Sequence, residues 1–431
     1  YPELLERFRL PLQDEGVPAH QVIAELIEHA EPGLAAMTGP RFHGWVIGGS
    51  NLTGVAADWL TSVWGQNAAN HLATPSASAA EETSANALLD LLDLPAKSSV
   101  GFTTGATMAN FTCLAAARSE VLRRAGWDVE ADGLFGAPPI TVLLGEEAHS
   151  TVFAALKYLG LGAHRVVKVA VDNEGAILPD AFRTAIAKAA GPIIAIAQAG
   201  QINTGACDPF IEIASAAREK NAWVHVDGAF GLWARATPTH AALGRGLELC
   251  DSWAVDGHKW LQTPYDCGYA IVRDSEAHRR SMLISASYLP GEGDGGRNPA
   301  DYVPELSRRA RGFATWAMIR HLGRRRIAEM ISRHCAFAVR FAERLAAAPG
   351  VEIVNKVVLN QVIVRFGGDD DLTRRTIARI QSDGVCFTAG SDWRGQWVMR
   401  ISVINDAATL EDVDRSADAM ISAWRAVRGR N

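Results

Sequence analysis

Short apolar runs alternate with longer segments of helical periodicity through the middle of this 431-residue chain. The runs have the length of strands and lie at residues 140–144, 166–171, 193–197, 223–226, 252–255 and 268–272. Strands that are separated by helix-length segments are joined by crossovers, which place parallel strands side by side with helices over both faces. The alternation therefore predicts an α/β fold with a mostly parallel, mixed sheet.

The pattern changes after Tyr302, where a long helical region over about residues 306–348 leads into a mixture of shorter strands and helices. This order predicts a smaller α+β domain at the carboxyl end. The first 65 residues have interrupted helical patterns, one of which ends at Pro32-Gly33. We therefore expect an amino-terminal helical arm (1–65), a large domain (66–312) and a small domain (313–431).

Composition excludes several classes of protein. The chain has 42 basic and 48 acidic residues and no basic stripe, which argues against nucleic-acid binding. Its six cysteines are scattered without a C-x-x-C spacing, which favours reduced thiols in a cytoplasmic protein over disulfides or a metal site. No segment approaches the ~20 apolar residues of a membrane span, and the amino end begins with charge rather than a signal sequence. We expect a soluble protein.

Lys259 is the residue that most constrains the chemistry. It follows His258 just after the predicted strand 252–255, and it stands 32 residues after Asp227, which ends the strand before. A lysine amine binds the aldehyde of pyridoxal 5′-phosphate (PLP) as a Schiff base, and a buried carboxylate keeps the pyridine nitrogen protonated so that the ring accepts electrons. Taken alone, Lys259 could be a solvated surface lysine, and Asp227 could belong to an ordinary strand followed by a turn. Together and in this order they predict a PLP enzyme acting on an amine.

A phosphate anchor is predicted between Gly101 and Asn110, directly before the helical pattern of 111–124. Main-chain N–H groups and the helix dipole there can face an anion, and Thr107 can add a hydroxyl. A plain helix cap is the alternative. The loop has neither the G-x-G-x-x-G spacing nor a Walker lysine, which disfavours dinucleotides and ATP. His149 follows the strand 140–144, where an imidazole can lie against a cofactor ring, orient a carboxylate or serve only the structure.

Several motifs along the chain share one resemblance. They are Pro40-Arg-Phe, Thr74-Pro-Ser, Ala148-His-Ser, Asn203-Thr-Gly-Ala-Cys-Asp-Pro209, His225-Val-Asp-Gly-Ala229, Asp256-Gly-His-Lys-Trp260, Tyr265-Asp-Cys-Gly268 and Ser307-Arg-Arg-Ala-Arg-Gly312. Over about residues 38–425 the chain resembles the group II PLP-dependent amino-acid decarboxylases, which include aromatic L-amino acid, glutamate and diaminobutyrate decarboxylases.

The resemblance implies fold type I, with a large PLP domain, a small carboxy-terminal domain and an amino-terminal arm that clasps a second subunit of a homodimer whose active sites lie at the interface. It implies that Lys259 is the Schiff-base lysine, Asp227 the partner of the pyridine nitrogen and His149 the residue stacked on the ring. By the same resemblance, the remaining cofactor-binding residues are Gly105, Ala106, Thr107, Asn203, Ala229 and His258.

Two departures from the family pattern bear on function. Asp256 stands where family members often have asparagine, and a carboxylate near a phosphate is unfavourable unless it is paired or turned away. Aromatic amino-acid decarboxylases protonate the carbanion with a tyrosine from a mobile loop, and here residues 285–305 contain Tyr288 and Tyr302. We expect Tyr302 to take that catalytic role, because it stands shortly before Ser307-Arg-Arg. A packing tyrosine at a helix entrance is the alternative.

Trp45, Val46 and Gly48 match the substrate-pocket segment of the family, and a tryptophan there suits an aromatic or apolar side chain. Arg400, on the predicted strand 397–402, stands where other fold-type-I enzymes bind a carboxylate, although it could equally be a surface arginine.

The leading interpretation is decarboxylation of an L-amino acid, with an aromatic or other bulky side chain, to its amine and CO2. The second keeps PLP and changes the reaction to transamination, aldol-type cleavage or oxidative deamination. The third is a regulatory subunit without turnover.

Overall fold

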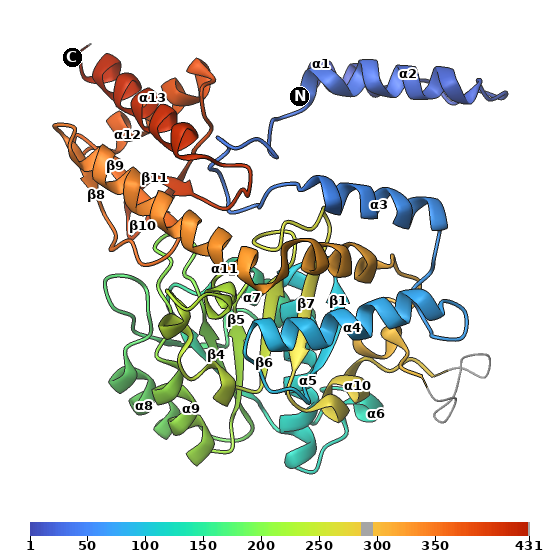
Figure 1. Cartoon of the computed structure of the whole chain (residues 1–431). Helices are drawn as coiled ribbons and strands as arrows, with labels where there is room; N and C mark the ends of the chain where they lie inside the picture. The colour runs from blue at the N-terminus through green and yellow to red at the C-terminus, as the bar shows by residue number, and fades with distance from the viewer. Residues whose placement is uncertain (286–295, 430–431) are drawn as a thin grey trace.

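The computed structural model describes residues 1–285 and 296–429. Its larger sheet has seven strands in the order β1-β7-β6-β5-β4-β2-β3 (Figure 1). The strands are β1 (Ser99–Thr103), β2 (Thr141–Gly145), β3 (Val167–Val169), β4 (Ile193–Gln198), β5 (Trp223–Asp227), β6 (Ser252–Asp256) and β7 (Gly268–Val272). Strands β3, β2, β4, β5 and β6 are parallel, whereas β7 runs antiparallel to both β6 and β1. The predicted mostly parallel, mixed sheet is confirmed.

Alternate residues of the central strands pack into two different hydrophobic cores, one on each face of the sheet. Leu143 of β2 packs in one cluster with helices α4 (Pro75–Leu91), α8 (Pro179–Lys188) and α9 (Phe210–Glu219). Its neighbours Val142 and Leu144 pack in a second cluster on the opposite face. The helices of that face are α5 (Ala106–Arg124), α7 (Ser150–Tyr158) and α10 (Ser275–Met282), with the short α6 (Val129–Asp132) beyond α5. The strands are apolar throughout because both faces of the sheet are covered.

The carboxy-terminal part has a sheet and a core of its own. Helix α11 (Arg311–Ala346) leads into it with a kink at Gly323, whose φ of 61° breaks the helical geometry. The antiparallel strands lie in the order β10-β11-β9-β8. Their bounds, with those of the two helices that cover them, are β8 (Val351–Ile353), β9 (Gln361–Phe366), β10 (Ala389–Trp393), β11 (Gln396–Ser402), α12 (Asp370–Asp383) and α13 (Leu410–Arg428). The predicted smaller α+β unit is confirmed.

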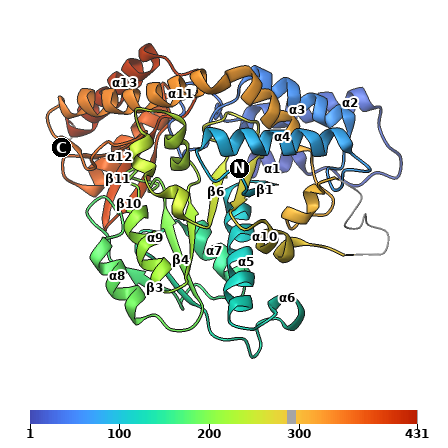
Figure 2. The same ribbon diagram turned by 60° about the horizontal axis from the view of Figure 1, so that its bottom comes forward.

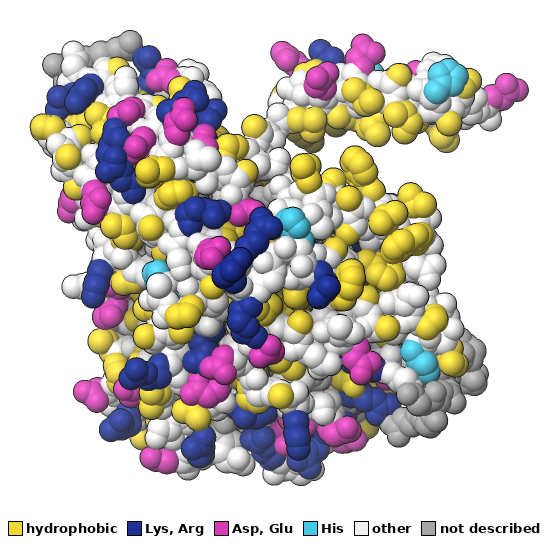
Figure 3. Space-filling view, viewed as in Figure 1, with side chains coloured by type: hydrophobic (Ala, Val, Ile, Leu, Met, Phe, Trp, Pro, Cys, Tyr) yellow, Lys and Arg dark blue, Asp and Glu magenta, His cyan; other side chains and the backbone are white. Residues whose placement is uncertain are grey.

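The amino-terminal helices α1 (Pro2–Phe8) and α2 (Ala19–Ala30) bury no residue of their own. They extend away from the body, whereas α3 (Leu52–Trp64) lies alongside α11 (Figures 1 and 2). Hydrophobic side chains follow the side of this arm that faces the body (Figure 3). The exposed apolar residues of these two helices are Leu5, Phe8, Val22, Ile23, Leu26 and Ile27.

The described residues also form short 3-10 helices: η1 (Glu31–Gly33), η2 (Gly231–Ala236), η3 (Ala241–Gly244), η4 (Leu247–Leu249) and η5 (Pro299–Tyr302). Among the described helices, none has both the length and the apolar character that crossing a bilayer requires. The four adjacent parallel strands β2, β4, β5 and β6 point their carboxyl ends to the same edge, which is the edge where ligands bind in open α/β sheets.

Candidate functional site

Lys259 lies in the turn that follows β6, with its side chain 15% exposed. Its Nζ is 3.0 Å from Oδ2 of Asp256, the last residue of β6. The neighbouring His258 is buried, and its Nδ1 accepts a hydrogen bond from the main-chain N–H of Cys267 at 3.3 Å. Burial lowers the pKa of His258, so its imidazole favours the neutral form. The ring of Tyr265 stacks on His258 with centroids 4.3 Å apart. The sequence did not predict Tyr265 as a residue of the site.

The predicted phosphate loop lies against this turn. Gly105 caps α5, and a Cβ there would lie 3.0 Å from Cε1 of His258. Ala106 opens the helix, and its N–H donates to Oδ1 of Asp256 at 2.6 Å. Thr107 follows in the same first turn. The structure therefore brings Gly105, Ala106, Thr107 and His258 together around the amino end of α5, as a phosphate site requires.

His149 and Asp227 belong to the same site. His149 caps α7, where its Nδ1 accepts from the N–H of Thr151 at 3.4 Å, which leaves the proton of the neutral ring on Nε2. Burial lowers the pKa of His149, while Asp227 opposes this shift and Lys259 adds to it. Asp227 is the last residue of β5, and its Oδ1 accepts from the N–H of Ala229 at 3.2 Å. The carboxylate is thus buried and oriented by the turn after β5, close enough to His149 to act on its pKa.

Two further predicted residues present polar atoms without protein partners. Arg400 of β11 is buried and donates through Nη2 to the carbonyl of Ile202 at 2.9 Å. Within the described residues, its Nε and the Oδ1 of the adjacent Asn203 are buried and have no hydrogen-bond partner. Arg400 is buried, which excludes a surface arginine, and its charge contributes to the lowered pKa of His149.

The predicted substrate segment lies beside the lysine turn. A Cβ on Gly48 would lie 1.9 Å from the main-chain oxygen of His258, so only glycine fits there. Trp45 is half exposed and has a left-handed φ of 55°. Its ring lies 5.2 Å from that of Phe387 and 5.9 Å from that of Phe42. Phe387, from the small domain, was not predicted, because no sequence pattern connects it with residues 345 positions earlier.

Tyr302 is not brought together with these residues. Its ring meets His278 edge-on at 5.3 Å and carries the guanidinium of Arg297 over its face at 4.1 Å. Its main-chain oxygen accepts from His278 at 2.9 Å. The catalytic role of Tyr302 stays a prediction, and the alternative candidate Tyr288 lies outside the described residues.

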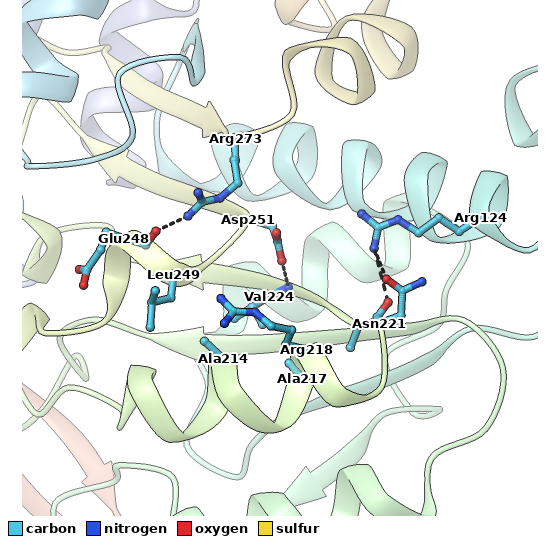
Figure 4. Close-up of a pocket in the computed structure, with 11 residues that line it drawn as sticks. Arg124, Ala214, Ala217, Arg218, Asn221, Val224, Glu248, Leu249, Asp251 and Arg273 are labelled. Carbon is cyan, nitrogen blue, oxygen red and sulfur yellow. Dashed lines mark hydrogen bonds between the residues drawn. The ribbon is translucent and has the colours of Figure 1, made fainter.

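A hollow of about 300 Å³ lies at the opposite edge of the sheet (Figure 4). Arg124, Arg218 and Arg273 line it, together with Asp251, whose carboxylate accepts from the N–H of Val224 at 2.7 Å. Arg124 and Arg273 are engaged by oxygen atoms of the protein. This hollow is at the amino ends of β5 and β6, away from Lys259.

The residues around Lys259 fit PLP. The amino end of α5 and its glycine-lined loop can hold the phosphate, Lys259 the aldehyde, Asp227 the pyridine nitrogen and His149 one face of the ring. The unpartnered atoms of Asn203 and Arg400 leave polar capacity for the cofactor and an amino acid.

Known proteins resemble the chain over most of its length. The model of the pyridoxal-dependent decarboxylase conserved domain matches residues 2–366. An aromatic-L-amino-acid decarboxylase of Bacillus atrophaeus is 27% identical over 87% of this chain and 79% of its own length. A 4-hydroxyphenylacetaldehyde synthase of Rhodiola rosea is 27% identical over 86% and 78%.

The fold matches as well. The crystal structure of Oryza sativa TDC with PLP and tryptamine superposes with a TM-score of 0.91 at 23% identity, covering 98% of this chain and 91% of that one. Lys259, Asp227 and the predicted phosphate loop lie at one edge of this fold-type-I sheet. The chain belongs to the pyridoxal-dependent decarboxylase family, whose members are lyases that use PLP to decarboxylate amino acids.

Proposed function

We propose that the protein decarboxylates an aromatic L-amino acid to its amine and CO2. The observation that carries the substrate class is the aromatic cluster of Phe42, Trp45 and Phe387. Trp45 stands three residues before Gly48, which packs against the main chain of His258 and Lys259. Phe42 and Phe387 stack in parallel at 4.6 Å, and Trp45 tilts against both while half of its surface stays exposed. An exposed ring held by two others offers an apolar face to an aromatic side chain. The relative from Bacillus atrophaeus supports the same substrate class.

Each side chain of the site has a task in this proposal. The bound cofactor supplies the electron sink for the electron pair that is left when the bond to the carboxylate breaks. Lys259 anchors the cofactor, and Asp227 holds the proton on its pyridine nitrogen. His149 keeps the ring flat against one side. Arg400 binds the substrate carboxylate, because burial lowers its pKa only to about 10 and the guanidinium stays charged at neutral pH.

The proposal extends to a homodimer and to a cytoplasmic location. Helices α1 and α2 present six large apolar side chains without burying any residue, and a second subunit is the partner that would cover them. The division into an arm (1–65), a large domain (66–312) and a small domain (313–431) goes with this architecture. The six cysteines are free thiols, which suits a reducing compartment. Sedimentation of the active protein tests the dimer, and an active monomer would contradict it.

The test of the reaction is a panel of L-amino acids, including 3,4-dihydroxyphenylalanine and diaminobutyrate, incubated with PLP-loaded protein. We expect CO2 and amine in equal amounts from an aromatic substrate. Trp45→Ala should raise KM for this substrate, whereas Phe135→Ala, which removes an exposed aromatic ring elsewhere, should not. Preference for an acidic or basic amino acid would refute the aromatic substrate class.

A second candidate function is oxidative deamination to the aldehyde. One observation favours it: the ring of Tyr302 is engaged by His278 and Arg297, so in this structure it is not placed to protonate a carbanion at the site. The amino acid, O2 and water would then give aldehyde, CO2, ammonia and hydrogen peroxide. Hydrogen peroxide formed in equal amount with CO2 by the unmodified protein would establish this reaction. If amine is the product instead, Tyr302→Phe should shift it toward aldehyde.

A further inference from the structure

The carboxylate of Asp256 lies inside the anion site at the amino end of α5. Its Oδ1 accepts from the N–H of Ala106 at 2.6 Å, and its Oδ2 lies 3.0 Å from Nζ of Lys259. The side chain is 3% exposed, and a Cβ on Gly105 would lie 3.3 Å from Oδ1. The Asp256 carboxylate thus already accepts a hydrogen bond from the Ala106 N–H, a helix N-terminal group that is suited to binding a phosphate.

The charges around this carboxylate do not compensate for a second anion. Lys259 is the one group that forms a short ion pair with Asp256 among the described residues, and its amine is the group that must bind the cofactor aldehyde. His258 lies 3.5 Å from Oδ1, but burial lowers its pKa and favours the uncharged ring. A phosphate group carries about −1.5 to −2 charges at neutral pH. It therefore meets a fixed negative charge that an asparagine would not present.

We propose that Asp256 is an internal competitor of the cofactor phosphate. In the cofactor-free protein it holds the Ala106 N–H and the Lys259 side chain in place. When PLP binds, its carboxylate repels the phosphate and limits the affinity, so the cofactor is held loosely and exchanges. This inference rests on the proposed cofactor roles of Lys259 and the α5 loop. Asp256 would thus set how tightly the cofactor phosphate is bound and how readily it is released.

The test compares PLP with pyridoxal, which lacks the phosphate. Both compounds carry an aldehyde that condenses with the Lys259 amine with loss of one water, so any effect of Asp256 on the lysine acts on both. Asp256→Asn keeps the shape and an oxygen acceptor for the Ala106 N–H, and its amide can donate to phosphate. We expect the Kd of PLP relative to that of pyridoxal to fall by ~10-fold, measured by absorbance titration of the cofactor-free protein.

Two further measurements make the result decisive. Asp14→Asn changes the net charge by the same amount on an exposed residue and should leave the ratio unchanged. Inorganic phosphate should raise the melting temperature of cofactor-free Asp256→Asn more than that of the unmodified protein. Asp256→Ser provides a second uncharged variant in case the asparagine variant does not fold.

An unchanged ratio, or weaker PLP binding in both folded Asp256 variants, would overturn the proposal. Failure of the unmodified protein to bind either aldehyde would overturn the cofactor assignment itself, together with the inference that rests on it. The two failures are therefore distinguishable by titration alone, without measuring turnover.

Discussion

Gly48 lies directly against His258: a Cβ on this glycine would come within 1.9 Å of the main-chain oxygen of His258 and within 2.9 Å of that of Lys259. Its φ of +86° is also one that other residues rarely adopt. Trp45 and Val46, just before it, have φ angles of 55°. The segment 45–48, which is the predicted substrate segment, and the lysine turn therefore constrain each other's position.

Replacing Gly48 with alanine should displace this turn. Because misplacement by about 1 Å can cost ~100-fold in rate, we expect Gly48→Ala to lower kcat/KM by that order while the far-UV circular dichroism stays unchanged. Gly16→Ala is the control, since a Cβ on Gly16 would have no neighbour within 4 Å. Full activity of Gly48→Ala would show that the turn can move away without loss.

Lys259→Ala should abolish the visible absorbance of the lysine-bound cofactor, because no other amine would bind the aldehyde at the end of β6. The measurement is an absorbance spectrum of the purified variant after gel filtration with excess PLP. Lys97→Ala, on an exposed lysine, should retain the spectrum. Persistence of the absorbance in Lys259→Ala would place the anchor on another lysine.

Asp227→Asn should separate cofactor binding from catalysis. The asparagine oxygen can still accept the Ala229 N–H that Asp227 accepts at 3.2 Å, so the turn should remain. The neutral amide cannot stabilise a protonated pyridine nitrogen, and we expect kcat to fall by ~100-fold or more, equivalent to about 2.7 kcal/mol. Near-normal turnover with bound cofactor would refute the role of Asp227 as the partner of the ring nitrogen.

The sheet was predictable because its central strands are covered on both faces and are therefore apolar over their whole length. Residues 223–226 and 268–272 were found within one residue of their observed ends. Strands β1 and β10 were not predicted: they contain Ser99 and Gly101 in one case and Gly390 and Asp392 in the other, which break the apolar run. Their positions depend on pairing with β7 and β11.

The site was predictable where sequence order determines the geometry. Asp227 ends β5 and Lys259 follows the adjacent parallel strand β6, so both lie at the same edge of the sheet. Contacts between distant segments were not predictable: Ala106 and Asp256 are 150 residues apart, and Phe42 and Phe387 are joined by an isolated β-bridge between segments at opposite ends of the chain. Sequence reasoning identified Asp256 as unusual, but whether it pointed toward or away from the phosphate loop needed the structure.

Arg400→Met should weaken binding of the substrate carboxylate while preserving much of the side-chain volume. Loss of a hydrogen bond to a charged group costs about 1.5–3 kcal/mol, so we expect KM for the amino acid to rise by ~10- to 100-fold. The product amine has no carboxylate, and its inhibition constant should not change. An equal loss of affinity for the amine would show that Arg400 shapes the pocket instead. Arg425→Met, on an exposed position of α13, is the control.

Acid should destabilise the protein through its buried histidines, of which His225 is the most informative. His225 is fully buried on β5, with Nε2 donating to Oδ1 of Asn110 at 2.8 Å and Nδ1 accepting from the Ser252 hydroxyl at 2.9 Å. Burial lowers its pKa from 6.5 to about 3. Below pH 6.5 His225 therefore binds a proton in the unfolded chain, whereas in the folded protein it binds that proton only near pH 3.

Stability contributed by the neutral ring is thus present above pH 6.5 and is lost as the pH falls toward 3. One such histidine lowers the free energy of unfolding by about 1.4 kcal/mol per pH unit across this window. In His225→Gln the melting temperature should depend less steeply on pH between 6.5 and 4, because one buried titrating group is removed. Some pH dependence should remain, because burial also lowers the pKa of His43, His278 and His334. The slope is the readout, since the variant can also have a lower melting temperature at neutral pH. His20→Gln, at an exposed position, should keep the original slope. An identical slope in His225→Gln would show that His225 titrates normally in the folded protein.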